Sequence, residues 1–198
     1  MNPRRHPLWR IARLPFPAVL CILLVLTAVN AGLGLAASGR APLRRTGRHI
    51  AELALLPGQA ADVLRTWSEA KVLPLAREAV VWDFAFIAGY AAALSIACLA
   101  FARRGGWFRQ WGGRCAWLAL LIGALDVVEN VGQLQMILRT QTGQALERWP
   151  ALTAAFAWPK WVLVLPVAAY LALAVVRGFR RETGARPFAR GAGAPGAA

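Results

Sequence analysis

Four long apolar runs alternate with hydrophilic segments along the chain. They span residues 14–37, 79–102, 115–138 and 151–176. Each has the roughly 20 apolar residues that a helix needs to cross a hydrocarbon core about 30 Å thick, at about 1.5 Å per residue. The pattern therefore predicts an all-α, polytopic membrane protein whose four transmembrane helices form one bundle within residues 1–176.

The first apolar run has a second interpretation. A basic segment precedes it, and Ala36-Ala37-Ser38 is a weak match to a signal-peptide cleavage site. The apolar region of a signal peptide, however, has only about 7–15 residues, and this run is longer. We therefore favour an uncleaved transmembrane helix.

Polar residues recur with a helical period inside the third apolar run. The strongest are spaced i, i+3, i+4 and i+7, namely Asp126, Glu129, Asn130 and Gln133. Residues at these spacings share one face of a helix. Each charge at mid-membrane costs about 2.5 kcal/mol or more, and hydrocarbon offers no partner for a carboxylate. We therefore expect this face to turn toward the bundle interior and to form a buried polar site.

The other runs carry polar residues that extend this candidate site. They are Asn30 in the first run, Asp83 and Tyr90 in the second, and Lys160 in the fourth. If successive helices alternate in direction, Asn30 and Lys160 lie at about the depth of Glu129 and Asn130. Asp83 and Tyr90 share a helix face because they are seven residues apart. The polar residues of all four runs then face one axis in the outer half of the bundle.

Each added residue also has a less specialised interpretation. Asn30 serves equally well as a hydrogen-bonding contact between helices. Asp83 fits an interfacial position beside Trp82, and Tyr90 fits a packed aromatic whose hydroxyl finds a backbone carbonyl. Lys160 can extend to the interface if the fourth helix begins at Trp158, with a proline in its first turn.

The charges of the candidate site are coupled. Asp126 and Glu129 lie one helical turn apart. Two such carboxylates resist ionising together at low dielectric, so we expect at least one of them to hold a proton. Lys160 then pairs with the other. Glu129 is the first candidate for that pair, Asp126 the second and Asp83 the last.

A single sizeable hydrophilic loop, residues 38–78, follows the first run. Within it, residues 59–70 have the pattern of an amphipathic helix, with one apolar side formed by Ala60, Val63, Leu64 and Trp67. One interpretation is a helix that lies on the membrane surface or on the ends of the other helices. The other interpretation is a lid over the polar site.

The charge distribution predicts the orientation. The chain is 58% hydrophobic with a net charge of +14, and its arginines cluster at the ends of the apolar runs. Cytoplasmic segments are enriched in such residues. We therefore expect both termini in the cytoplasm, the 38–78 loop outside, and a basic, disordered cytoplasmic tail over residues 177–198. Nucleic-acid binding is not expected, because no basic helix or aromatic–basic module is present.

Cofactor and metal sites are not expected from this sequence. The cysteines, Cys21, Cys98 and Cys115, are far apart, without a C-x-x-C motif or a nearby histidine. This excludes the usual disulfide framework and zinc spacing. Nothing in the pattern indicates haem, flavin or an iron–sulfur cluster.

Short polar motifs in the apolar runs carry a family resemblance. They are D-x6-Y (Asp83, Tyr90), D-x2-E-N (Asp126, Glu129, Asn130) and the lysine Lys160. With these motifs, residues 50–175 resemble an uncharacterised group of bacterial four-helix integral membrane proteins. The resemblance implies a multi-pass protein of the bacterial inner membrane in which these polar residues matter. It implies no reaction.

Two classes of function fit these features. The favoured one is a non-enzymatic module that binds a proton, an ion, a specific lipid or a partner helix; transport would require a homo-oligomer. The alternative is a membrane-embedded enzyme whose paired carboxylates supply general acid and base to a lipid or isoprenoid-like substrate. The sequence contains no nucleophile motif, Walker A or HExxH.

Overall fold

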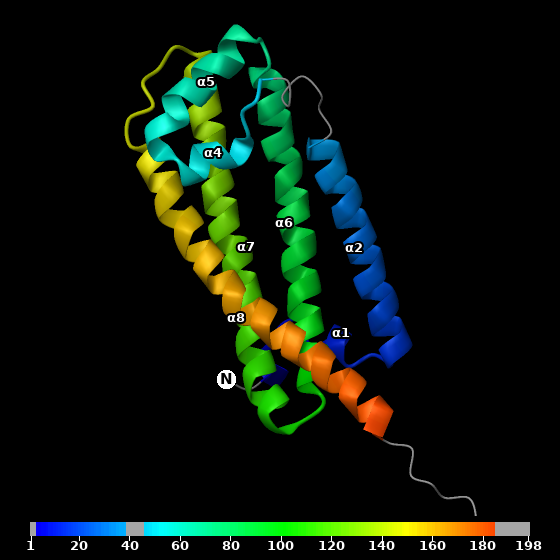
Figure 1. Ribbon diagram of the computed structural model, residues 1–198. Coiled ribbons are helices and arrows are strands. Elements are labelled where there is room, and N and C mark those ends of the chain that lie inside the picture. The colour runs from blue at the N-terminus through cyan, green and yellow to red at the C-terminus, as the bar shows by residue number, and fades with distance from the viewer. Residues whose placement is uncertain (1–2, 39–45, 185–198) are drawn as a thin grey trace, which may run out of the picture.

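All regular elements in the described part of the chain are helices. A computed structural model describes residues 3–38 and 46–184 (Figure 1). In chain order the elements are η1 (Pro3–Arg5), α1 (Trp9–Ala12), α2 (Phe16–Ser38), α4 (Ile50–Leu55), η2 (Pro57–Gln59), α5 (Ala60–Glu69), α6 (Leu73–Ala102), α7 (Gly106–Gln141) and α8 (Trp149–Gly184).

Three helices are long and apolar enough to cross a membrane. They are α6, α7 and the stretch Trp149–Arg177 of α8. This supports the prediction of an all-α, membrane-embedded protein. In α2 the apolar stretch found among the described residues is shorter, covering Pro17–Val29.

The long helices extend beyond the predicted crossings. α6 begins at Leu73 and α7 at Gly106, so the connection expected over residues 103–114 is reduced to Arg103–Gly105. Gly105 and Gly106 have φ angles of 79° and 53°, a backbone region that favours glycine, and they allow this tight reversal. The basic residues that follow, Arg109 and Arg114, belong to the first turns of α7.

The last helix also differs from the prediction. α8 begins at Trp149 and continues past Arg177 to Gly184. The first residues of the predicted disordered tail are therefore helical. Residues 185–198 lie outside the described part of the chain.

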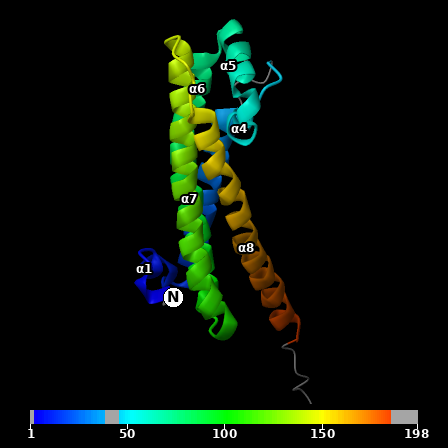
Figure 2. The same ribbon diagram turned by 90° about the vertical axis from the view of Figure 1, so that its left-hand side faces the viewer.

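The helices form neighbouring pairs. α6 packs along α7, α7 packs along α8, and α2 packs against α6 (Figures 1 and 2). Glycines on α7 permit the close approaches: a Cβ atom on Gly123 would lie 2.8 Å from Cβ of Ala91, and one on Gly132 would collide with Oγ1 of Thr153. Contact between α6 and α8 is sparse, which leaves room between them on one side of α7.

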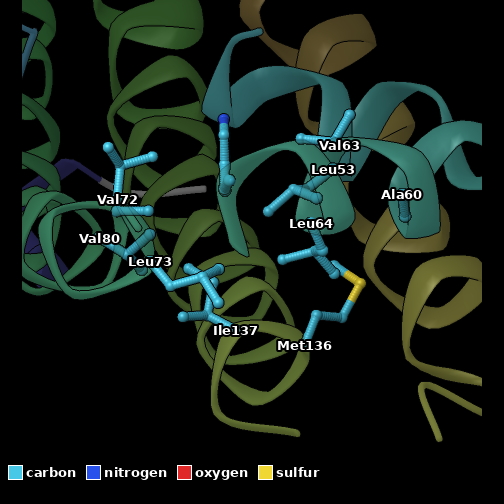
Figure 3. Packing of buried hydrophobic residues seen from close by; sticks show 11 residues of the cluster. Leu53, Ala60, Val63, Leu64, Val72, Leu73, Val80, Met136 and Ile137 are labelled. Carbon is cyan, nitrogen blue, oxygen red and sulfur yellow. The ribbon is translucent and has the colours of Figure 1, made fainter. Parts of the chain in front are cut away.

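The short helices α4 and α5 cover one end of the α6–α7 pair, here termed the capped end. Their apolar residues, including Leu53, Val63 and Leu64, pack with Met136 and Ile137 of α7 in one cluster (Figure 3). In α5 the residues Ala60, Val63, Leu64 and Trp67 are buried, whereas Asp62, Arg65 and Glu69 on the opposite side are exposed. The apolar side of α5 is thus used to pack on the helix ends.

The opposite end holds α1 and the α6–α7 turn and is here termed the arginine-rich end. Ala12 of α1 packs there with Cys98, Leu99 and Phe108. The hydroxyl of Tyr170 on α8 lies 3.2 Å from the carbonyl oxygens of both Cys98 and Phe108, so it links α8 to the turn between α6 and α7.

Candidate functional site

The four polar residues of the α7 face are all buried. Asp126 and Glu129 have exposed fractions of 9% and 6%, and Asn130 and Gln133 of 2% each. Val127, Val128 and Val131 on the same turns are exposed. α7 therefore turns its polar face toward α6 and α8 and its aliphatic face outward.

Lys160 of α8 lies between the two carboxylates of α7. Its Nζ atom is 2.6 Å from Oδ1 of Asp126 and 2.6 Å from Oε2 of Glu129. Because α8 begins at Trp149, the interpretation in which the helix starts at Trp158 and Lys160 extends to the interface is wrong. Lys160 is 8% exposed, and its ammonium group donates hydrogen bonds to both carboxylates.

α6 contributes Tyr90 and Asp83 to the same cluster. The hydroxyl of Tyr90 donates to Oδ2 of Asp126 at 2.6 Å, so that this carboxylate is held from two helices at once. Nδ2 of Asn130 donates to Oδ2 of Asp83 at 2.7 Å. The backbone-bonded interpretation of Tyr90 therefore does not describe this structure, whereas the interfacial position of Asp83 stays a prediction.

Gln133 completes the network and leaves one acceptor unused. Its Nε2 atom donates to Oε1 of Glu129 at 3.0 Å. Its Oε1 atom is buried and has no hydrogen-bond partner among the described residues. An acceptor buried without a partner costs about 1–3 kcal/mol, so this oxygen is an unsatisfied polar atom within the described part of the network.

One predicted site residue is not placed. The backbone of Asn30 belongs to α2, but its side chain lies outside the described part of the structure. The remaining predicted residues are brought together by α6, α7 and α8, as listed here: Asp83, Tyr90, Asp126, Glu129, Asn130, Gln133 and Lys160.

These residues line a cavity of about 1000 Å³ that is partly open. Its other walls are mainly apolar and include Phe86 and Leu94 of α6, Ile122 of α7, and Trp161 and Val164 of α8. Such a volume is at the upper end of the range for small-molecule sites, about 300–1000 Å³. Sequence reasoning did not single out these apolar residues, because an aliphatic side chain facing a cavity resembles one facing lipid.

The chain preceding α4, together with α4 itself, forms part of the cavity wall toward the capped end. Arg48, His49, Ile50 and Leu55 all line it. The position is fixed locally, because the Glu52 carboxylate accepts from the backbone N–H of His49 at 2.8 Å and from Arg48 Nη1 at 3.1 Å. The 38–78 segment therefore reaches the polar cavity through α4 and not through α5.

The formal charge of the cluster is negative. Asp83, Asp126, Glu129 and Lys160 sum to −2 if all are ionised. Among the residues whose side chains are described, no group of three or more His, Cys, Asp or Glu side chains is arranged to hold a metal ion. Lys160 occupies the position between the two α7 carboxylates that a cation would otherwise take.

No protein-family model, curated protein or solved structure matches this chain. The cavity and its polar network are therefore the basis on which a function is inferred.

Proposed function

We propose that this protein crosses the bacterial inner membrane four times, with both termini in the cytoplasm. The support is the length of α2, which has 23 residues, together with the three longer apolar helices. Arg10 of α1 lies at the same end as Arg103 and Arg104 of the α6–α7 turn, as expected for a cytoplasmic side. On this proposal the capped end faces outward, and the resemblance to the four-helix group implies the same number of crossings.

The proposed function is the binding of an amphipathic molecule in the cavity between α6, α7 and α8. The observation that carries it is the composition of the cavity, which has apolar walls for a hydrocarbon chain beside the charged network around Lys160. A hydrocarbon chain gains about 0.8 kcal/mol for each CH₂ group it buries. The polar network then selects the other end of the molecule.

The network favours a head group that donates hydrogen bonds or carries a positive charge. Its formal charge is −2 if all four ionisable groups are charged, and among the described residues Oε1 of Gln133 is an acceptor without a hydrogen-bond partner. A hydroxyl or an ammonium group satisfies that acceptor, whereas a phosphate or carboxylate head would meet the charges of Asp83, Asp126 and Glu129. We propose an amine- or hydroxyl-headed amphiphile.

In this proposal α4 serves as the lid of the cavity. Arg48, His49 and Ile50 lie on its wall, and the loop expected to act as a lid provides them. α5 has a different role, because its apolar residues are buried against the ends of α6 and α7. α5 holds α4 in place.

A matched pair of substitutions on α8 tests the proposal. Val164 lines the cavity, whereas Val162 on the same helix is 63% exposed. The V164W substitution should fill the cavity with an indole ring. The V162W substitution should add an aromatic group that faces lipid. Protein extracted in mild detergent would be examined by native mass spectrometry, with identification of the co-purified lipids.

We expect a bound amphiphile on the wild type and on V162W and a loss of it from V164W. Equal occupancy in both variants would place the bound molecule elsewhere and contradict the proposal. The thermal stability of the protein would also be measured with amine-, hydroxyl- and phosphate-headed amphiphiles of equal chain length. The absence of any bound lipid in the mass spectra, together with no gain in stability from any of these amphiphiles, would also contradict the proposal. Stabilisation by the phosphate-headed compound alone would reverse the proposed head-group preference.

A second candidate function is catalysis on the same bound molecule. Tyr90 O–H and Lys160 Nζ both bond to the Asp126 carboxylate at 2.6 Å, which gives a connected path for proton transfer beside the cavity. In this case the amphiphile identified on the wild type would change in mass during incubation, and D126N would bind it without converting it. The non-enzymatic function predicts an unchanged molecule.

A helix from a second copy or from another membrane protein is the competing occupant. A Cβ atom added at Gly32 of α2 would meet no other described part of the chain within 4 Å, so this face of α2 has room for a partner helix. A partner helix in the cavity would appear in native mass spectra as a dimer or heteromer that V164W disrupts and V162W does not. That result would replace the amphiphile by a protein partner.

A further inference from the structure

A second cavity, of about 870 Å³, lies at the arginine-rich end, remote from the polar network. Arg4, Arg13, Arg103 and Arg109 line it, together with Trp9 and Gln110. These residues come from the N-terminal segment, the C-terminal end of α6 and the first turn of α7. Nothing in the proposed function of the first cavity uses them.

The walls of this cavity are fixed by specific contacts. Nη1 of Arg103 donates to the carbonyl oxygens of Ala12 at 3.1 Å and Leu14 at 2.9 Å, which ties α1 to the end of α6. Pro3 is buried against Gly113, where an added Cβ would lie 3.2 Å from Cβ of Pro3. Several contacts between different elements of the fold therefore fix the shape of this cavity.

Among the described side chains, none of the carboxylates belongs to this cavity. The acidic residues whose side chains the structure describes lie at the capped end or in the polar network, and they are Glu52, Asp62, Glu69, Glu78, Asp83, Asp126, Glu129 and Glu147. No described carboxylate lines the cavity. The guanidinium groups of Arg13, Arg103 and Arg109 around one space therefore favour a bound anion.

The arginines at this end fall into two groups. Arg104 donates to the carbonyl oxygen of Ala174 at 3.0 Å, and Arg177 lies over the rings of Trp107 and Phe108. The side chains of Arg13 and Arg109, by contrast, are exposed on the cavity, and their guanidinium groups make no hydrogen bond or ion pair with the described residues. Their donors remain available to a ligand.

We propose that this cavity binds the phosphate group of an anionic membrane lipid. Guanidinium groups recognise phosphate oxygens with two parallel hydrogen bonds, and basic pockets beside membrane helices suit such head groups. The cavity adjoins the start of α2, whose exposed Leu20 and Leu24 offer an apolar surface for acyl chains. Trp9 at the cavity lies where indole rings favour the membrane interface.

The experiment uses the full chain with Arg13 and Arg109 both replaced by glutamine. The matched control is R77Q/R148Q, because Arg77 and Arg148 are also exposed but lie at the capped end. Native mass spectrometry would measure the binding of phosphatidylglycerol and phosphatidylcholine to detergent-purified protein. Arg103 is left unchanged because it holds α1, and circular dichroism would verify that both variants are folded.

We expect a preference for phosphatidylglycerol that R13Q/R109Q weakens about 30-fold and that R77Q/R148Q leaves unchanged. Equal losses in the two variants would show a non-specific charge effect and overturn the proposal. Equal binding of the two lipids would also overturn it. Displacement of the lipid by millimolar inorganic phosphate would identify a soluble anion as the ligand and reject the lipid.

Discussion

Nζ of Lys160 lies 2.6 Å from Oδ1 of Asp126, and an equal distance separates it from Oε2 of Glu129. One ammonium group from α8 thus neutralises charge on two turns of α7. Because all three side chains are nearly buried, removing one partner leaves an uncompensated charge, whereas removing the whole set does not.

Replacing Lys160 by methionine should lower the free energy of unfolding by about 3–5 kcal/mol, because it leaves both carboxylates without a cation. Adding E129Q to K160M should recover part of this loss, and D126N/E129Q/K160M should recover more. Thermal stability in detergent, measured for each variant, is the readout. Losses that simply add, with no recovery in the multiple variants, would mean that the three side chains do not act as one charge cluster.

Gly112 sets the distance between α7 and the end of α6. A Cβ atom there would lie 2.7 Å from the carbonyl oxygen of Cys98 and 2.5 Å from the hydroxyl of Tyr170. G112A should therefore lower the free energy of unfolding by about 1–3 kcal/mol through overpacking. The matched control is G32A, since Gly32 is also helical but a Cβ atom added there would meet no other described residue within 4 Å. Equal melting temperatures for the two variants would contradict this packing.

His6 gives the arginine-rich end a dependence on pH. Burial lowers the pKa of His6, and the backbone carbonyl of Ala116 opposes this only partly. The ring is 3% exposed and lies edge-on to Trp117 at a centroid distance of 4.8 Å. The folded protein thus favours neutral imidazole. This contribution to stability is complete above the unfolded pKa of about 6.5 and is lost as the pH falls through the lower folded pKa.

The test compares the wild type with H6Q between pH 7 and pH 5. The melting temperature of the wild type should fall more steeply with decreasing pH, because only the wild type must protonate a buried imidazole. The other titrating groups are common to both proteins and cancel in the difference. Parallel curves would show that His6 does not control stability in this range.

The proposed topology places the two ends of α7 on opposite sides of the membrane. Reporter fusions at Gly105, in the α6–α7 turn, and at Gly143, after α7, should give opposite signals, with Gly105 in the cytoplasm. A third fusion after Arg177 should match Gly105. Equal signals from Gly105 and Gly143 would remove the basis for the four-crossing arrangement.

The polar face of α7 could be predicted because it depends only on the helical period. Asp126, Glu129, Asn130 and Gln133 are close in sequence, and any helix through this stretch brings them together. Placing Lys160 near them required only a consistent count of depth along antiparallel helices. The particular partner could not be predicted, because one turn of offset between α7 and α8 decides whether Lys160 contacts Asp126, Glu129 or both.

The cavity itself could not be predicted from the sequence. It depends on the sparse contact between α6 and α8. Gly123 lets α7 approach α6, and Gly132 lets α7 approach α8, while α6 and α8 make little contact with each other. The early start of α7 was missed for a different reason. Its first turns contain Arg109 and Arg114 among tryptophans, a composition that fits both a loop and a helix at the membrane edge.

The most direct test of the proposed function is an experimental structure of the protein extracted with its native lipids, at a resolution that shows ordered water. The account predicts elongated density along Phe86, Leu94 and Val164, ending in a donor group within hydrogen-bond distance of Oε1 of Gln133. A cavity filled only by water, or by a helix of another chain, would contradict the binding of an amphiphile at the Lys160 network.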